Sequence, residues 1–245
     1  MGIMPNQLFL PVFSMQQKKP NLLLDLGINI IIPSIILMKL SGDDQLGTLG
    51  ALLLAVAFPL GYGGYEMVKH KKTHLISVLG LVSVLLTGGI GVLELDNKWL
   101  AIKEAAIPGL IGLIVLASTF TPFAFVKKFL FSPAILETEK INQILAERQN
   151  TEAFEKSLTN ANIMFAGSFA FSAVMNYVLA KWVVTSETGT EAFNEELGQL
   201  ALLSYPVIAI PATIIMMGVF YYLWRSINNL TGLKLEEVLR EDLQK

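Results

Sequence analysis

The chain has 245 residues, of which 53% are hydrophobic and 16% are charged, and its mean hydropathy is +0.57. Ordinary soluble domains carry about 25% charged residues, so this composition excludes a typical water-soluble protein and predicts an integral membrane protein. The formal net charge of -2 offers no basic surface, which excludes nucleic acid as a partner. The absence of cysteine excludes disulfides, thiolate metal sites and cysteine nucleophiles.

Residues 1–21 precede the long apolar segments and form a separate N-terminal leader. The apolar stretch at residues 8–12 is too short for the hydrophobic core of a signal peptide and has no basic residues before it. We expect an interfacial or irregular leader, held near the membrane by Lys18 and Lys19.

Six apolar runs follow, and a helix needs about 20 residues to cross the hydrocarbon core of a bilayer. The runs are rich in Leu, Ala and Gly and show no alternating polarity, which favours helices over barrel strands. The sequence therefore predicts an all-α integral membrane protein with transmembrane helices 1–4 in residues 22–128 and helices 5–6 in residues 162–225. The predicted spans are 22–38, 46–67, 75–95, 99–125, 163–184 and 200–224.

Between the fourth and fifth spans, residues 129–161 are predicted to form an amphipathic helical segment on the inner side. Ser132 is a suitable N-cap and Pro133 a suitable first helical residue. One apolar face is expected on this helix, formed by Ile141, Ile144 and Leu145. The tail at 226–245 has similar character and is expected to be cytoplasmic.

The distribution of basic residues predicts the orientation, because Lys and Arg near short loops are retained on the cytoplasmic side. With both termini inside, 14 of the 18 basic residues fall inside. The predicted outer loop at 185–199 contains four glutamates and no Lys or Arg. We expect a multi-pass protein of the bacterial inner membrane with both termini cytoplasmic.

Polar residues inside membrane spans are costly unless paired or hydrated, so they are candidate site residues. An inner layer of such residues comprises Asp25, Asn29, Tyr62, Glu66 and Arg225. Asp25 and Asn29 share one helix face with Pro33, which leaves the carbonyl of Asn29 without its helical partner. The structural alternative is that Asp25 pairs with the leader lysines and favours the helix dipole.

An outer layer comprises Glu94, Asp96, Lys103, Glu104, Asn176 and Lys181. The short turn after residue 95 makes the third and fourth spans an antiparallel hairpin, which brings Glu94 and Lys103 to similar depth. We expect a partly buried ion pair between these two residues. The alternative is that the charged groups of this layer extend to the outer interface beside Trp99 and Trp182.

Five of the six predicted spans contain proline or clustered glycine, and interrupted helices form binding sites in many transporters. The same residues are common in ordinary membrane helices, where small side chains allow close packing. The chain has no phosphate-binding loop and no recognisable hydrolase or metalloprotease motif. The sequence therefore assigns no catalytic residue, metal or cofactor.

The stretch TGGIGVLELDNKWLAIKEAAIPGLIGLIVLAS at 87–118, followed by PFAFVKKFLF, resembles the core of the bacterial intracellular septation protein A family. The resemblance extends to LLLDL in the first span, and the chain also resembles uncharacterised bacterial membrane proteins distantly similar to that family. Positions that match the pattern include Gly88, Gly89, Asn176 and Asn194. The resemblance implies an inner-membrane protein associated with cell-envelope synthesis and septation, and it implies no catalytic residues.

Two main functional hypotheses follow. The first is an inner-membrane protein that supports envelope synthesis or septation through contacts with lipids, with envelope-synthesis or division proteins, or with a second copy of itself. The alternative is a small transporter or channel that uses the two polar layers. An intramembrane lipid enzyme is a third hypothesis, although no motif nominates one.

Overall fold

The computed structural model describes residues 26–70, 75–121 and 124–239, and the side chains of residues 66–70 and 75–81 lie outside the description. Within these residues the protein is all-helical and has no strand, which confirms the all-α part of the predicted fold class. An isolated β-bridge pairs Leu136 with Leu239. The helical elements are η1 (Gly27–Ile31), α2 (Ile32–Lys39), α3 (Gly47–His70), α4 (Leu75–Val92), α5 (Lys98–Ser118), η2 (Val126–Leu130), α6 (Thr138–Glu147), α7 (Thr151–Val183), α8 (Glu191–Ser204), η3 (Tyr205–Ala209), α9 (Ile210–Thr231) and α10 (Leu235–Val238).

Four helical stretches among the described residues are long and apolar enough to cross a membrane: Gly47–Tyr65, Lys98–Ser118, Thr151–Val183 and Glu191–Thr231. Two further apolar stretches, Gly27–Lys39 and Val82–Val92, are shorter. The second of these belongs to α4, whose 18 residues extend about 27 Å, close to the roughly 30 Å of a hydrocarbon core. The membrane character of the chain is therefore supported by four helices.

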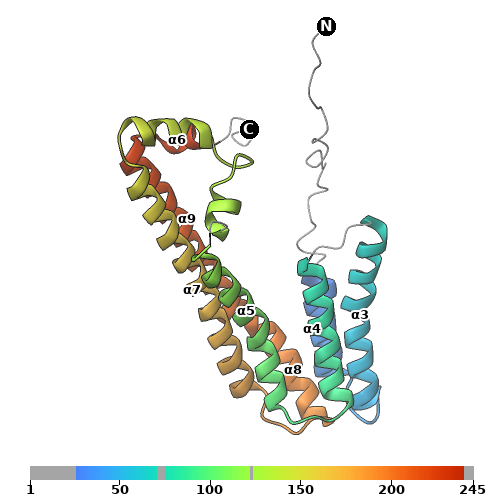
Figure 1. The fold of residues 1–245 in the computed structure, drawn as a ribbon. Helices are drawn as coiled ribbons and strands as arrows, with labels where there is room; N and C mark the ends of the chain where they lie inside the picture. The colour runs from blue at the N-terminus through green and yellow to red at the C-terminus, as the bar shows by residue number, and fades with distance from the viewer. Residues whose placement is uncertain (1–25, 71–74, 122–123, 240–245) are drawn as a thin grey trace.

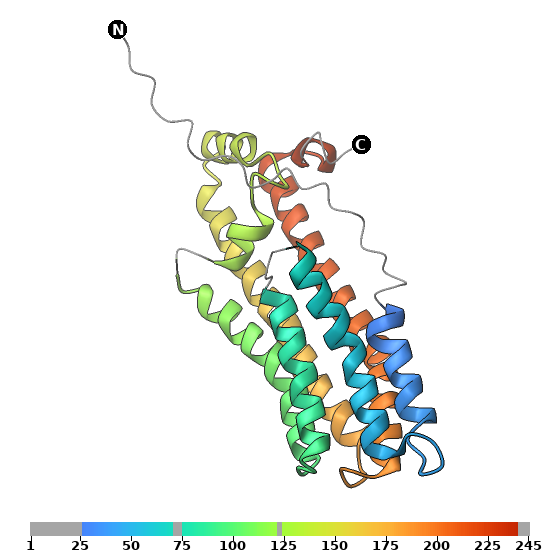
Figure 2. The ribbon, with the colours of Figure 1, turned by 90° about the vertical axis from the view of Figure 1, so that its right-hand side faces the viewer.

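The long helices form two arms that meet at one end (Figures 1 and 2). One arm contains α2, α3 and α4, and the other contains α5, α7 and α9, with extensive packing of α5 and α9 against α7. The arms meet at the end that carries the α2–α3, α4–α5 and α7–α8 loops. There α8 packs against α2, whereas α9 continues along α7, so the α8–η3–α9 rod belongs to both arms.

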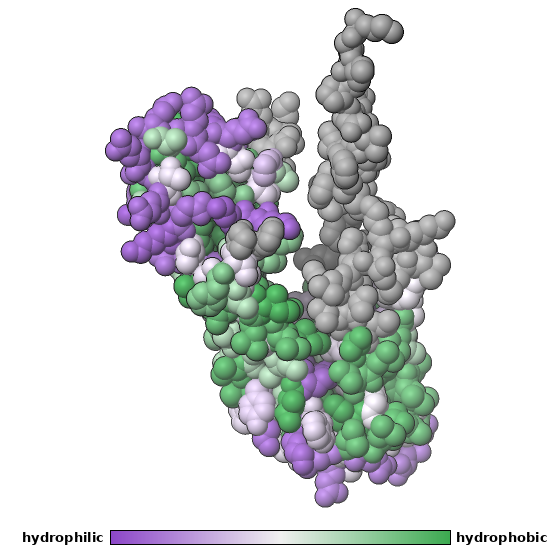
Figure 3. Space-filling model, in the orientation of Figure 1, coloured by the Kyte–Doolittle hydropathy of each residue, from purple (hydrophilic) through white to green (hydrophobic). Residues whose placement is uncertain are grey.

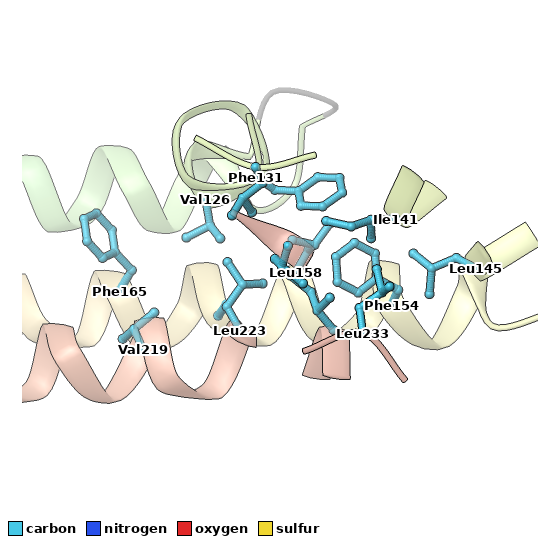
Figure 4. Close-up of a cluster of buried hydrophobic side chains, with 14 of the residues drawn as sticks. Val126, Phe131, Ile141, Leu145, Phe154, Leu158, Phe165, Val219, Leu223 and Leu233 are labelled. Atoms are coloured by element: carbon cyan, nitrogen blue, oxygen red, sulfur yellow. The ribbon is translucent and has the colours of Figure 1, made fainter. Parts of the chain in front are cut away.

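Two hydrophobic cores correspond to this arrangement. The core at the loop end joins α2, α3, α4, α5, α7 and α8, with Leu100 and Phe193 completely buried. The other core extends along α5, α7 and α9 to the opposite end of the molecule, where Phe154 lies beside Ile141 and Leu145 of α6 (Figure 4). We call this opposite end, residues 124–162 and 223–239, the cap, and its outer surface is mostly hydrophilic (Figure 3).

The inner amphipathic segment differs from its prediction in its helix boundaries. Ser132 begins a turn in which the amides of Ile135 and Leu136 donate to its carbonyl, and α6 begins only at Thr138. Its predicted apolar face is confirmed, because Ile141 and Leu145 are buried. Residues 151–160 belong to α7, whose 33 residues span about 50 Å. This length exceeds a bilayer core, so the start of α7 extends into the cap.

The predicted outer loop at 185–199 is also shorter than expected. Helix α8 already begins at Glu191, where the Thr190 side chain accepts a hydrogen bond from the Phe193 amide. This contact is the usual N-cap interaction of threonine.

Two of the prolines in the predicted spans lie beside or within π-helical turns, and two lie inside regular α-helices. Pro33 follows the π-helical η1, where the Ile32 amide donates to Gly27 O, and Pro206 lies in the π-helical η3. Pro59 and Pro108 lie inside the continuous helices α3 and α5. The helices therefore continue through these four prolines, and the wider turns at Pro33 and Pro206 accommodate residues that lack an N–H donor.

Candidate functional site

The most deeply placed described charge in a candidate membrane span is Lys103 on α5. The residue is only 8% exposed. Its Nζ atom donates to Glu104 Oε1 at 2.6 Å, to Thr87 Oγ1 at 2.7 Å and to Ser83 Oγ at 3.3 Å. An ammonium group has three N–H donors, so this pocket satisfies the whole hydrogen-bonding capacity of Lys103.

Helix α4 supplies the two hydroxyls because Ser83 and Thr87 are one turn apart and lie on the same helix face. The Thr87 hydroxyl donates to the carbonyl of Ser83 at 3.1 Å, which leaves its oxygen lone pairs for the lysine. Sequence analysis missed both hydroxyls. The available signal was a pair of hydroxyl residues at i and i+4 facing a charged residue across a short hairpin.

The predicted ion pair between Glu94 and Lys103 is wrong. Helix α4 ends at Val92, and Glu94 adopts a φ of 49° in the turn that follows. Its exposed side chain lies against Gly189 of the α7–α8 loop, where an added Cβ would be 3.0 Å from Glu94 Oε1. The left-handed turn directs this carboxylate away from α5, and Lys103 pairs with its neighbour Glu104 at 2.6 Å.

Glu104 is the more accessible member of the pair, with 27% of its side chain exposed against 7% for Lys103. Figure 3 shows a hydrophilic spot within the apolar band where the two arms meet. The described parts of α4 and α5 contribute Lys103 and Glu104 as their only charges beyond the terminal Lys98.

Asn176 of α7 lies at nearly the same level as Glu104. Gly112 of α5 lies against Phe169, and Gly109 lies against Ala173. This antiparallel register places Asn176 within about one turn of Glu104. Its amide donates to Ser172 O of its own helix at 2.7 Å.

The remaining members of the predicted outer layer lie at the loop end. Asp96 pairs with Lys98 at 3.1 Å and accepts a hydrogen bond from the Lys98 amide at 2.8 Å. The amide and the ammonium of Lys98 hold the pKa of the Asp96 carboxyl below its ordinary value. Asp96 and Lys181 are both exposed, so they belong to the boundary of the spans and not to the Lys103 pocket.

Among the described members of the predicted inner layer, Arg225 lies apart from Asn29 and Tyr62. Asn29 lies on η1, which packs against α3, and Tyr62 lies on α3. Arg225 lies on α9 in the cap, where it is exposed and donates to Tyr221 Oη at 3.1 Å. Asp25 lies outside the described residues, and so does the side chain of Glu66.

Two of the positions nominated by the family resemblance, Gly88 and Asn194, take part in helix packing. An added Cβ on Gly88 would be 3.4 Å from Val56, so this glycine brings α4 close to α3, whereas the same atom on Gly89 would meet nothing within 4 Å. Asn194 is 1% exposed and donates to Ser41 Oγ at 3.0 Å and to Thr48 O at 2.7 Å. These bonds hold α8 against the α2–α3 loop and the first turn of α3.

A second buried amide, Asn162 of α7, was not nominated by the sequence. It is completely buried, and its Nδ2 donates to Val115 O at 2.8 Å and to Thr119 Oγ1 at 2.7 Å. Its Oδ1 accepts from the Val126 amide at 3.0 Å. Asn162 thereby joins the end of α5 to the start of η2, where backbone groups lack helical partners.

Among the described residues, no group of three or more His, Asp or Glu side chains could hold a metal ion. No known family model, curated protein or solved structure matches the chain.

Proposed function

We propose that the chain is a six-span protein of the bacterial inner membrane with both termini in the cytoplasm. The seven basic residues of the described cap, against three at the loop end, support a cytoplasmic cap. The loop end is acidic, with eight carboxylates: Asp43, Asp44, Glu94, Asp96, Glu187, Glu191, Glu195 and Glu196. The alternating directions of the long helices support six crossings, with η1–α2 and α4 as the two shorter ones.

Within this membrane protein, the Lys103–Glu104 pair is the basis of a small transporter or channel for protons or small polar solutes. A buried ion pair rarely stabilises a protein more than well-packed apolar side chains of similar size. A protein that only packed against partners would gain nothing from an ammonium and a carboxylate inside a span. Intramembrane charges commonly mark the paths of protons and ions, and this pair is the observation that carries the proposal.

The two members of the pair have different roles in this proposal. Glu104, the more exposed member, takes up a proton or a solute donor group. When it does so, its attraction for the Lys103 ammonium weakens, and Ser83 and Thr87 remain as hydroxyl acceptors for that ammonium. Loading of Glu104 therefore changes the contact between α4 and α5 near the point where the two arms meet.

The test is proton flux into liposomes that contain the purified chain and a pH-sensitive dye. We expect the wild type to dissipate an imposed pH gradient faster than empty liposomes, and Glu104→Gln to lose most of this flux. Glu94→Gln is the matched control, because Glu94 is exposed and lies outside the pocket. Equal flux in wild-type and Glu104→Gln liposomes would contradict a role for the pair in proton movement.

A second function, support of envelope synthesis or septation through protein contacts, is favoured by the cap. Its apolar residues are buried in their own core, and its outer surface is mostly hydrophilic. A folded unit of this kind can present a stable surface to a cytoplasmic partner. The test places substitutions on the cap surface and expresses the variants in cells that lack the protein. Variants that no longer restore normal envelope growth or division, although their proton flux in liposomes is unchanged, would favour this function over transport.

A further inference from the structure

A groove between η1 and α3 takes no part in the Lys103 pocket. It has a volume of about 440 Å³ and is lined by Ile28, Ala57, Phe58, Gly61, Tyr62 and Tyr65. This volume is within the range of small-ligand sites. Among the described residues the groove is shallow and largely open.

The lining is almost entirely apolar, and Gly61 keeps it open. An added Cβ on Gly61 would meet nothing within 4 Å. A leucine or phenylalanine at this position would therefore occupy the groove without displacing the backbone. Such a surface attracts hydrocarbon in preference to a charged or strongly hydrogen-bonding ligand.

The position of the groove points to a lipid. It lies between Ala57 and Tyr65, inside the candidate span Gly47–Tyr65 and towards the end far from the α2–α3 loop. These residues cover about 12 Å of helix, close to the roughly 15 Å of hydrocarbon in one leaflet. The groove is continuous with the outward apolar surface of α3, where Leu53 and Leu54 are exposed.

The two tyrosines give the groove a direction. Tyr62 and Tyr65 lie near the end of the apolar part of α3, shortly before Glu66 and the basic residues that begin at Lys69, and tyrosine is enriched where membrane helices meet the headgroup region. The glycerol end of a lipid would then lie beside the tyrosines and its chain beside Ala57.

We propose that this groove binds one acyl chain of a phospholipid from the leaflet on the cap side. The inference requires that α3 spans the membrane. It does not require that Lys103 and Glu104 move protons, so lipid labelling and proton flux can fail independently.

The test uses the full chain in detergent with a phosphatidylcholine that carries a photoreactive diazirine on its acyl chain, at about one lipid per protein. After irradiation, label on residues 57–65 is compared with label on the exposed α9 surface at residues 210–217. We expect about fivefold enrichment in the groove, and Gly61→Phe should remove it. Gly63→Phe is the matched control, because Gly63 is equally open on α3 but does not line the groove.

Retained labelling in Gly63→Phe together with its loss in Gly61→Phe would support the lipid site. Equal labelling of α3 and α9 would overturn it, since the lipid would then be ordinary surrounding lipid. Unchanged labelling in Gly61→Phe would overturn it as well. If Gly61→Phe does not fold, Ala57→Leu on the same wall provides the second variant with the same expected loss.

Discussion

At the scale of single residues, an ammonium group inside an apolar helix is stable only when each of its N–H bonds has an acceptor. Lys103 meets this condition through one carboxylate and two hydroxyls. The depth of Lys103 was visible in the sequence, but its partner was not. Glu94 and Glu104 were both near enough in the chain, and the left-handed conformation of Glu94 decided between them.

Removal of the lysine should be strongly destabilising. Lys103→Ala leaves the Glu104 carboxylate without its cation, and breaking a buried pair typically costs about 3–5 kcal/mol, with the lower end expected here because Glu104 is partly exposed. Glu104→Leu in the same chain should recover part of the loss. The measurement is unfolding in detergent, and Glu94→Gln should leave the midpoint unchanged. A large shift of the midpoint in Glu94→Gln would instead indicate that Glu94 is a partner of Lys103.

Asn162 should matter more for stability than any other described asparagine of α7. Asn162→Ala leaves the Val126 amide without its acceptor, at about 1–3 kcal/mol for a buried group left unsatisfied, whereas the Val115 carbonyl keeps the hydrogen bond from the Ser118 hydroxyl. Asn176→Ala serves as the control because Asn176 bonds only within its own helix. The test compares unfolding free energies and exchange of the Val126 amide. Equal effects of the two substitutions would remove the special role of Asn162.

At the scale of secondary-structure elements, close helix packing explains how α8 can join the first arm. Gly198 of α8 lies against α2, where an added Cβ would be 2.9 Å from Ser34 O and 2.6 Å from Met38 Cγ. Small residues at such crossings let two backbones approach closely. The α2–α8 contact therefore depends on the absence of a side chain at one position.

Two glycine-to-alanine substitutions test this contact. Gly198→Ala should destabilise the protein by about 1–3 kcal/mol, the usual range for forcing extra atoms into a packed region. Gly218→Ala on α9 has open space at its Cβ and should be neutral or stabilising by up to about 1 kcal/mol through helix propensity. Thermal unfolding of the two variants tests whether the α2–α8 contact depends on Gly198. A neutral Gly198→Ala would mean that α2 and α8 can separate at little cost.

The attachment of α10 to α6 should depend on pH. Glu237 accepts the Lys234 amide at 2.9 Å and pairs with Lys140 of α6 at 3.6 Å. The amide first, and Lys140 next, hold the pKa of Glu237 below its ordinary value. Since the pKa is lower in the folded state, the stabilisation is present above the unfolded value of about 4.3 and is lost as pH falls through the folded value.

Hydrogen exchange of the Glu137 amide, which donates to Val238 O, reports this attachment. Its protection factor should fall as the pH decreases below about 4. Glu237→Gln should remove this pH dependence, and Glu139→Gln on α6 should retain it. If the protection factor of the Glu137 amide depends on pH in the same way in wild type and Glu237→Gln, groups other than Glu237 control the attachment of α10 to α6.

At the scale of the whole molecule, the cap and the loop end should lie on opposite sides of the membrane. The chain has no cysteine, so single cysteines can be introduced without a background reaction. In intact cells, Glu187→Cys at the loop end should react with a membrane-impermeant maleimide. Asn142→Cys on α6 should react only after the membrane is permeabilised. The reverse pattern would invert the proposed orientation.

The sequence by itself determined the class of the protein and the existence of its long helices. A chain with 53% hydrophobic residues and long apolar runs without alternating polarity satisfies its backbone in lipid as helices, and four helices among the described residues have the required length. It also identified the buried face of α6, because Ile141 and Leu145 follow helical periodicity. These are local properties, which depend on residues near one another in the chain.

Only the tertiary structure decided which polar groups meet. The Ser83 and Thr87 hydroxyls, the reach of Asn162 to η2, and the placement of Arg225 in the cap depend on helix register and on turn conformation. The boundary of α7 depends on them too, since residues 151–160 remain helical because Phe154 and Leu158 find a core formed by α6 and α9. Contacts between distant segments have no periodicity in the sequence, so they become visible only when the helices are packed.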